Sequence, residues 1–345
     1  MDREIIPTGP EGDDCFDPTG VDATGEQVTL FSAAADHGTR IDRFLSERLS
    51  TFSRSYFQQL LEQGHVTLGG RVVVKAATRL KVGDVVEVRL APTEQASAFK
   101  PEAISLDVLH EDDDLLVINK PAGLVVHPGA GNWSGTLLNG LLNHHAAAAQ
   151  LPRAGIVHRL DKDTSGAMVV AKNRETMEAL VRQIAARQIQ RLYLAVVGRA
   201  WPFESTVMVH QAIGRDPKNR VRMAVLDHSH AGAKPAQTQL LCLQTTPQAA
   251  LVAAKLFTGR THQIRVHLSW LGCPLIADSV YGGAIHEVLA RQALHAARLV
   301  FPHPSNGRPV DCRAPLPDDF QRLLQSEGLH YNPSFLRNAA FSPVR

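Results

Sequence analysis

Apolar positions near the start of the chain follow the spacing of a small folded module. Two runs, at 41–49 and 56–61, place apolar residues three or four positions apart and predict helices. Residues 66–74 read as a hairpin around two glycines, and alternating apolar residues predict a further strand at 86–90. The pattern therefore predicts a compact α/β unit over residues 39–90.

A longer and more mixed pattern follows from residue 102. Several apolar runs succeed one another directly, without the regular strand–helix alternation of a parallel sheet. The pattern predicts α+β architecture around a largely antiparallel mixed sheet, in one domain over residues 102–325. Strands are expected at 106–110, 115–119, 124–127, 167–171, 190–197, 238–243 and 250–257, and helices at 136–145, 174–187, 261–271 and 286–292.

Three stretches lack such a pattern. Residues 1–35 are acidic and rich in Gly, Pro, Asp and Thr, so we expect a disordered tail. Residues 91–101 are small or polar, with Pro92 and Pro101 near the ends, and are the expected linker. Residues 326–345 read as an irregular tail.

The charge of the chain is unevenly distributed. Its net charge is only +2, but the first 35 residues hold eight carboxylates against one arginine. The rest of the chain is therefore basic, which makes a polyanionic partner plausible. The 39–90 module contributes several cations, whose face could be a solvated surface or a polyanion-binding one. We take five of them as candidate RNA contacts: Arg40, Arg43, Arg54, Arg71 and Lys75.

Other signals narrow the class of protein. The four cysteines show no paired spacing, and the 16 histidines match no HExxH or Cys/His pattern, so we expect no metal site. The N-terminus lacks a signal-peptide pattern, and no apolar run reaches the roughly 18 residues of a membrane span. We therefore expect a cytoplasmic protein.

One polar loop between two apolar strand-like pieces concentrates reactive side chains. It contains His158, Arg159, Asp161 and Asp163, followed by Thr-Ser-Gly. Such loops present reactive groups on a rigid scaffold, although either aspartate could instead bond backbone amides in a turn. Leu160 separates the Arg from the Asp, and no nucleotide-binding loop is present, so the segment is not a kinase loop.

A second polar segment precedes the helix expected at 261–271. Arg260 could contact a phosphate there together with the first amides of the helix. Arg265 lies beside the apolar Ile264 and would need an anionic partner if it is partly buried, or else it is a surface residue. Tyr193, in an apolar strand, reads on its own as a core aromatic residue.

With these segments in view, the chain resembles the RluA family of pseudouridine synthases, and most closely its D-type enzymes, which modify large-subunit ribosomal RNA. The 39–90 module resembles an S4 RNA-binding domain. Two small departures are visible: Arg191 stands where the family usually has Lys, and Ala277-Asp278 where it often has Gly-Asp. The stretches that carry the likeness are residues 117–129, 158–166, 258–267 and 294–304.

The resemblance implies a role for each candidate residue. Asp161 would attack the uridine nucleotide or abstract a ribose proton, with Arg265 paired to it. Tyr193 would pack on the uracil and could serve as a base, beside an apolar wall formed by Ile264. Arg159 would enter the RNA stack left by the flipped nucleotide. The remaining substrate-binding candidates are Arg260 and His262, and His158 is expected to be structural.

The implied activity is isomerisation of uridine to pseudouridine, which involves no redox change and no net water, so no cofactor is expected. The expected target is the helix 69 hairpin of 23S rRNA, free or in the pre-ribosomal large subunit, and the expected state is a monomer. Three alternatives stay open: another large-subunit target of the C type, a ribosome-assembly factor with incidental modification, and a hydrolase that releases uracil.

Overall fold

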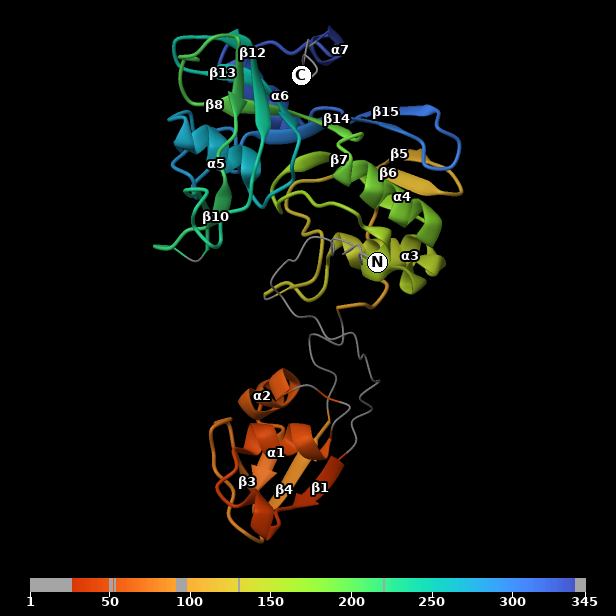
Figure 1. The fold of residues 1–345 in the computed structure, drawn as a ribbon, viewed down its shortest axis with the longest axis vertical. Coiled ribbons are helices and arrows are strands. Elements are labelled where there is room, and N and C mark those ends of the chain that lie inside the picture. The colour runs from red at the N-terminus through yellow and green to blue at the C-terminus, as the bar shows by residue number, and fades with distance from the viewer. Residues whose placement is uncertain are drawn as a thin grey trace, which may run out of the picture. The chain divides into compact units, whose positions relative to one another are not determined.

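A computed structural model describes residues 27–49, 52, 54–90, 98–129, 131–219 and 221–338. The chain divides into two compact units, Met1–Ala98 and Phe99–Arg345, whose helices and strands are drawn in Figure 1. The described residues of each unit have their own hydrophobic core.

The first unit packs two helices on a four-stranded antiparallel sheet of order β1-β4-β2-β3. The expected helices, hairpin and strand are confirmed. The predicted disorder of residues 1–35 is wrong for Gln27–Phe31, because these residues form β1, which pairs with β4 along its whole length. Residues 1–26 and 91–97 of the expected tail and linker lie outside the described residues. The elements are β1 (Gln27–Phe31), η1 (Ala34–Asp36), α1 (Ile41–Arg48), α2 (Arg54–Glu62), β2 (Val66–Leu68), β3 (Arg71–Val72) and β4 (Val85–Arg89).

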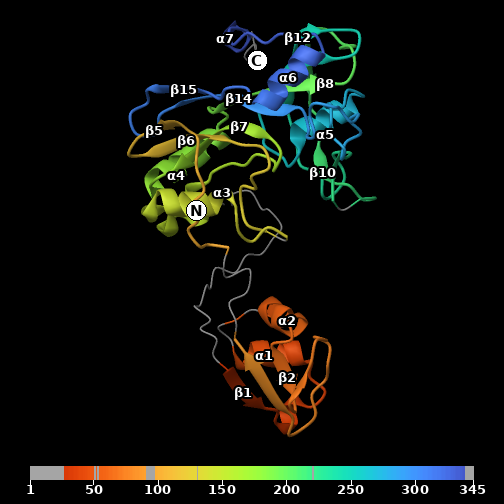
Figure 2. The same cartoon turned by 180° about the vertical axis from the view of Figure 1, so that it is seen from behind.

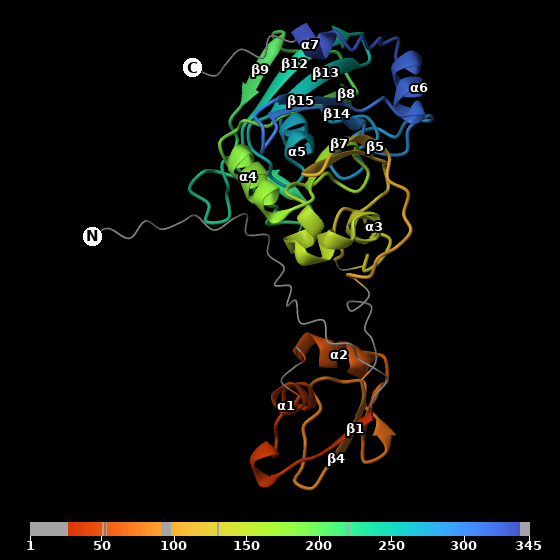
Figure 3. The ribbon, with the colours of Figure 1, turned by 90° about the vertical axis from the view of Figure 1, so that its right-hand side faces the viewer.

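The second unit is built around one mixed sheet, in the order β5-β6-β7-β14-β8-β13-β12-β9, with β15 also paired to β14. Figure 3 shows β9, β12 and β13 side by side. Every pairing in this sheet is antiparallel except that of β7 with β14. The expected α+β class and largely antiparallel mixed sheet are therefore confirmed.

The strands of this unit are β5 (Val108–Glu111), β6 (Leu115–Lys120), β7 (Ser165–Ala171), β8 (Gln190–Val197), β9 (Thr206–Val209), β10 (Ile213–Arg215), β11 (Met223–Val225), β12 (Thr238–Thr245), β13 (Ala250–Leu256), β14 (Leu294–Pro302) and β15 (Pro309–Arg313). Its helices are α3 (Leu137–His144), η3 (Ala146–Gln150), η4 (Pro152–Gly155), α4 (Arg174–Ala185), α5 (Gln263–Trp270), α6 (Asp318–Ser326) and α7 (Phe335–Asn338). Across the described ranges, no helix combines the length and the apolar character needed to cross a membrane.

Two predicted elements are wrong. Residues 124–127 form no strand, because the carbonyls of Val125 and Val126 instead accept the amides of Leu137 and Leu138 at the start of α3. Residues 286–292 form no helix. Segments this short are ambiguous by periodicity alone, and at 124–127 the tertiary hydrogen bonds decide the outcome.

The C-terminal tail is also less irregular than predicted. Helix α7 lies within it, and Leu329 and Leu336 are buried against Phe320 and Leu323 of α6. The described part of the tail, residues 326–338, thus completes this core, and residues 339–345 lie outside the described residues.

The sheet of the second unit is covered on both faces. Helices α3 and α5 pack on the face that includes Met168, Tyr193 and Val252, while α6 packs on the face that includes Leu194 and Leu251. Figures 1 and 2 show α5 and α6 on opposite sides of the strands. Successive residues of a strand point to opposite faces of a sheet. Neighbours such as Tyr193 and Leu194 are both buried, so both faces of the central strands are apolar.

The parallel pair of β7 and β14 holds the beginning of β7 close to the centre of the sheet. Ser165 is opposite His295, and Gly166 is opposite Ala296. Gly166 has φ of 116°, and a Cβ at this position would fall on the carbonyl oxygen of Ala296. Only glycine allows this approach, and it places the polar loop before β7 at the edge of the buried core.

Candidate active site

Asp161 lies in the loop that leads into β7, and its side chain is 14% exposed. The Thr164 amide donates to the Asp161 carbonyl at 3.1 Å, which closes the loop on itself. From outside the loop, Arg291 Nη1 donates to the Asp163 carbonyl at 3.0 Å and Gln292 Nε2 to Thr164 Oγ1 at 3.2 Å. The segment mistaken for a helix therefore anchors the loop that carries the carboxylate.

Arg265 joins two carboxylates inside the fold. From α5, its Nη1 donates to Asp161 Oδ2 at 3.1 Å, while its Nε and Nη2 donate to Asp278 at 2.8 and 2.9 Å. Burial alone would lower the pKa of Arg265, but the bonds to Asp278 and the charge of Asp161 raise it above its ordinary value. The anionic partner expected for Arg265 is present, and the guanidinium is permanently charged.

Asp278 is the site residue that sequence reasoning missed. Its side chain is only 1% exposed, and its Oδ1 also accepts the amide of Tyr281 at 3.2 Å. The bidentate contact fixes the plane of the guanidinium, so that Nη1 is directed at Asp161. The sequence offered one signal, an Asp in a turn beyond the helix, but no pattern tied that turn to Arg265.

His262 stands at the N-terminus of α5 in the left-handed conformation, with φ of 55°. Its Nε2 lies 4.0 Å from Asp161 Oδ1, and its Nδ1 is hydrogen-bonded to Tyr281 Oη at 2.8 Å. Tyr281 Oη also accepts the Met223 amide at 2.9 Å, and the Tyr281 ring lies 4.9 Å from the guanidinium carbon of Arg265. Tyr281 therefore contacts both residues that face Asp161.

Two apolar candidates line the same region. Tyr193 on β8 is 5% exposed and Ile264 on α5 is 3% exposed, and both belong to the core cluster under α5. Burial raises the pKa of Tyr193 to about 12, with the Asp161 charge adding to the effect and Arg191 opposing it. The phenol is therefore protonated at neutral pH, which suits a packing surface better than a base.

The remaining candidates from the two polar segments are Arg159, Arg260 and His158. Arg159 is exposed, while Arg260 Nε donates to the Pro235 carbonyl at 3.1 Å. His158 has a structural contact, since its Nε2 accepts the Val169 amide at 3.1 Å and burial lowers its pKa to about 3. This contact supports the expected structural role of His158, which stays a prediction.

The five cations of the first unit fall into two groups. Arg40 and Arg54 both donate to Asp42, whose side chain is completely buried. Arg43 donates to Glu47 at 2.7 Å. Arg71 and Lys75 are exposed on the hairpin and just after it, so these two present the least compensated charge of the five.

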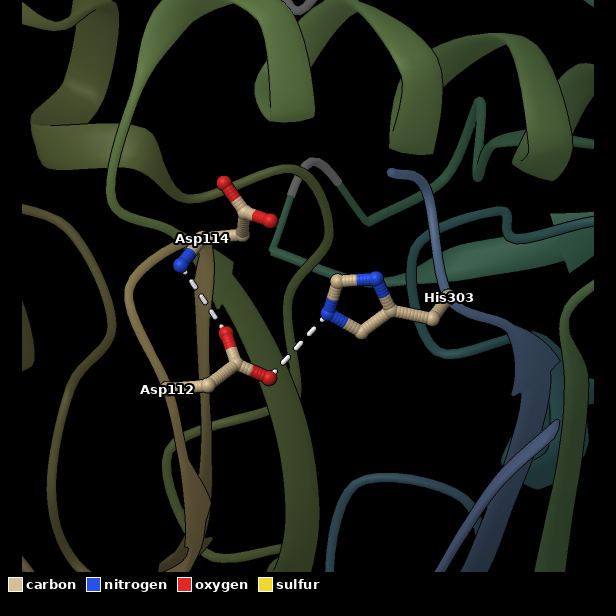
Figure 4. Close-up of side chains that lie close together, drawn as sticks. All are labelled: Asp112, Asp114 and His303. Atoms are coloured by element: carbon tan, nitrogen blue, oxygen red, sulfur yellow. Dashed lines mark hydrogen bonds and ion pairs between the residues drawn. The ribbon is translucent and has the colours of Figure 1, made fainter. Parts of the chain in front are cut away.

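One cluster of possible metal ligands lies away from this site. Asp112, Asp114 and His303 offer ligand atoms within 4.8 Å of one another (Figure 4). The carboxylate oxygens of the two aspartates already accept hydrogen bonds, however. Asp112 accepts two amides and the rings of His110 and His303, and Asp114 accepts Asn173 and Ser305. The cluster therefore joins the β5–β6 turn to neighbouring loops through hydrogen bonds.

Comparison with known proteins identifies the class that this fold and site define. Residues 114–270 match the family model of RNA pseudouridylate synthases, and residues 39–86 match that of the S4 domain. The chain belongs to the pseudouridine synthase family, so it is an isomerase that converts uridine to pseudouridine, and it carries an S4 domain.

Similar relatives carry a more specific name. Proteins named ribosomal large subunit pseudouridine synthase D are 45% identical in Neisseria meningitidis (83% of this chain, 78% of the relative), 45% in Nitrosomonas europaea (84% and 84%) and 43% in Vibrio vulnificus (87% and 95%). Among solved structures, human RNA pseudouridylate synthase domain containing 1 matches with 27% identity and a TM-score of 0.54, over 71% of this chain and 98% of its own.

Proposed function

We propose that this enzyme isomerises specific uridines of large-subunit ribosomal RNA, with the helix 69 hairpin of 23S rRNA as target and Asp161 as the reacting carboxylate. The names of the relatives support the ribosomal substrate. The observation that carries the assignment of Asp161 is its 3.1 Å contact with the buried Arg265. We place the enzyme in the cytoplasm as a monomer acting on 23S rRNA, free or in the pre-ribosomal large subunit.

Asp161 would act in one of two ways. It either attacks C1′ of the target nucleotide or removes a proton from the ribose, and in both cases the C1′–N1 bond breaks and the base is held for reattachment through C5. Arg265 holds the Asp161 carboxylate in position, while Tyr193 and Ile264 hold the detached ring. Arg159, exposed at the loop, would fill the space that the flipped nucleotide leaves in the RNA, and Arg260 and His262 would contact the substrate beside it.

His262 would contribute a neutral hydrogen-bond donor. Burial lowers its pKa, so the imidazole is uncharged near neutral pH and carries one N–H. The hydroxyl of Tyr281 already accepts the Met223 amide, so its own proton is best directed at His262 Nδ1. That assignment leaves the proton on Nε2, which faces Asp161.

Replacing Tyr281 with Phe should therefore slow the reaction without weakening RNA binding. One lost hydrogen bond is worth about 1 kcal/mol, which predicts a fall of roughly five-fold in the single-turnover rate. Tyr331→Phe, which removes a hydroxyl beside the α6 core, is the matched control. An unchanged rate for the Tyr281 variant would contradict the assigned tautomer.

The S4 unit would contribute affinity through phosphate contacts. Of its candidates, Arg71 and Lys75 should matter most because they are exposed. Changing both to Ala should weaken RNA binding and flatten the dependence of log Kd on log salt by roughly 0.7–0.9 for each lost cation. Arg43→Ala, whose partner is Glu47, should have a smaller effect. Equal slopes for the double variant and the wild type, measured by filter binding across a salt series, would argue against this surface.

The target is tested by mapping pseudouridines in ribosomal RNA from cells with and without the gene. Loss confined to the helix 69 hairpin is expected, and loss elsewhere in the large-subunit RNA would transfer the assignment to a different site such as the C-type target. Growth rescue by an inactive Asp161 variant would support an assembly role. Release of free uracil from RNA without pseudouridine would indicate a hydrolase.

A further inference from the structure

Arg191 on β8 is a buried cation without a counter-charge. The residue is 8% exposed, and in the part of the chain that the structure describes no carboxylate lies within ion-pair distance of it. Its Nε is buried and has no hydrogen-bond partner. Arg265, by contrast, forms ion pairs with two carboxylates. Burying an unpaired charge is unfavourable, and an anionic ligand would supply the counter-charge that Arg191 lacks.

The position of Arg191 links it to the site of Asp161. Arg191 and Tyr193 are two residues apart on one strand, so their side chains leave the sheet on the same face. A Cβ at Gly259 would lie 2.9 Å from Arg191 Nη1, so the guanidinium lies against the segment that leads into α5. The charges of both Arg191 and Asp161 act on the Tyr193 hydroxyl. The Tyr193 hydroxyl thus has both a carboxylate and an unpaired cation near it.

The reaction creates an anion that needs such a cation. When the C1′–N1 bond breaks, the electron pair stays on N1, and the detached uracil carries a negative charge spread over N1 and its carbonyl oxygens. The C1′–C5 bond then forms, the C5 proton leaves and N1 is protonated, so atoms and charge balance. Arg265 cannot serve this anion, because its one positive charge is shared by Asp161 and Asp278.

We propose that Arg191 binds a carbonyl oxygen of the target uracil and stabilises the detached uracilate anion. The proposal rests on the proposed function, since it assigns a residue to that reaction. A phosphate oxygen of the flipped nucleotide offers the same chemistry from another source. The two sources differ in when the charge exists: a phosphate is present in the bound RNA, whereas the uracilate appears only during the reaction.

Two variants separate charge from packing. Arg191→Met keeps a long side chain and removes the charge, and Arg191→Lys keeps the charge. The Met variant should lose roughly 10²–10³-fold in single-turnover rate at saturating enzyme, with little change in the Kd for RNA. Its melting temperature should be unchanged or raised, because the unpaired charge is gone. The Lys variant should recover most of the rate.

A substrate with a better leaving group provides a further test. In RNA containing 5-fluorouridine at the target, the fluorine withdraws electrons and stabilises the uracilate, so the deficit of Arg191→Met should shrink. The readout is the disappearance of 5-fluorouridine from nuclease digests of the RNA. The wild type and the Lys variant, assayed in parallel, serve as references.

Each contrary result has a distinct meaning. A lowered melting temperature for Arg191→Met, with no rescue of rate by Lys, would overturn the proposal in favour of a structural role. Weaker RNA binding with a normal rate at saturating enzyme, or a rate deficit that is equal on both substrates, would overturn it in favour of a phosphate contact. Failure of the wild type to form pseudouridine in ribosomal RNA would refute the proposed function itself, which is a separate outcome.

Discussion

Asp161→Asn is expected to reduce the single-turnover rate of pseudouridine formation by roughly 10⁴-fold or more, because it removes the group that attacks or deprotonates the ribose. The fold should survive. Asn keeps an oxygen that can accept from Arg265 Nη1, and Arg265 remains fixed by its two bonds to Asp278. RNA binding should survive as well, since the carboxylate contributes charge of the wrong sign for a polyanion.

Asp163→Asn is the matched control for this experiment. Asp163 lies in the same loop, and its backbone carbonyl, which the substitution leaves in place, is the atom held by Arg291. Its rate should stay close to that of the wild type when both variants are assayed on the same transcript. Pseudouridine formation by Asp161→Asn at a rate comparable to Asp163→Asn would remove Asp161 from the chemistry.

Arg265→Met should damage both stability and activity. It leaves Asp278, which is 1% exposed, and Asp161 without their shared cation. Losing one partner of a buried ion pair costs about 3–5 kcal/mol, which corresponds to a fall in melting temperature of roughly 10 °C for a unit of this size. The reaction should be nearly abolished, because Asp161 loses the group that aims it.

The double variant Arg265→Met/Asp278→Asn separates these two effects. Asp278→Asn removes the buried carboxylate charge that Arg265→Met leaves without a partner. The melting temperature of the double variant should therefore be higher than that of Arg265→Met alone. The rate should not recover, because Asp161 still lacks its cation. Restored activity in the double variant would mean that Arg265 acts only through the stability of the fold.

The elements predicted well from the sequence are those whose pattern is local. The apolar spacing of Ile264 and Leu268 predicted α5 almost to its ends, and the run at 190–197 predicted β8. Strand β14 was missed because its sequence begins Leu-His-Ala-Ala-Arg, which lacks both alternation and a continuous apolar run. It is a strand because β7 and β8 pair with it on either side.

The residues of the candidate site likewise include some that the sequence could predict and some that it could not. A partly buried arginine implies an anionic partner, so a contact between Arg265 and a carboxylate was predictable. Asp278 and Tyr281 were not, because they lie in a turn with no periodicity and are brought to Arg265 by the fold. The same holds for Arg191, whose missing counter-charge is a property of the surroundings and not of its neighbours in the sequence.

Strand β14 lies in the middle of the sheet but is synthesised late. Before Leu294 appears, a growing chain has made every strand of that sheet except β14 and β15, and until then β7 and β8 have no strand to join them. Arg291 and Gln292, which anchor the Asp161 loop, are also translated only just before this strand. An unfinished chain can therefore complete its S4 unit early and still lack a working carboxylate. A working carboxylate therefore requires a chain that has been made at least through β14.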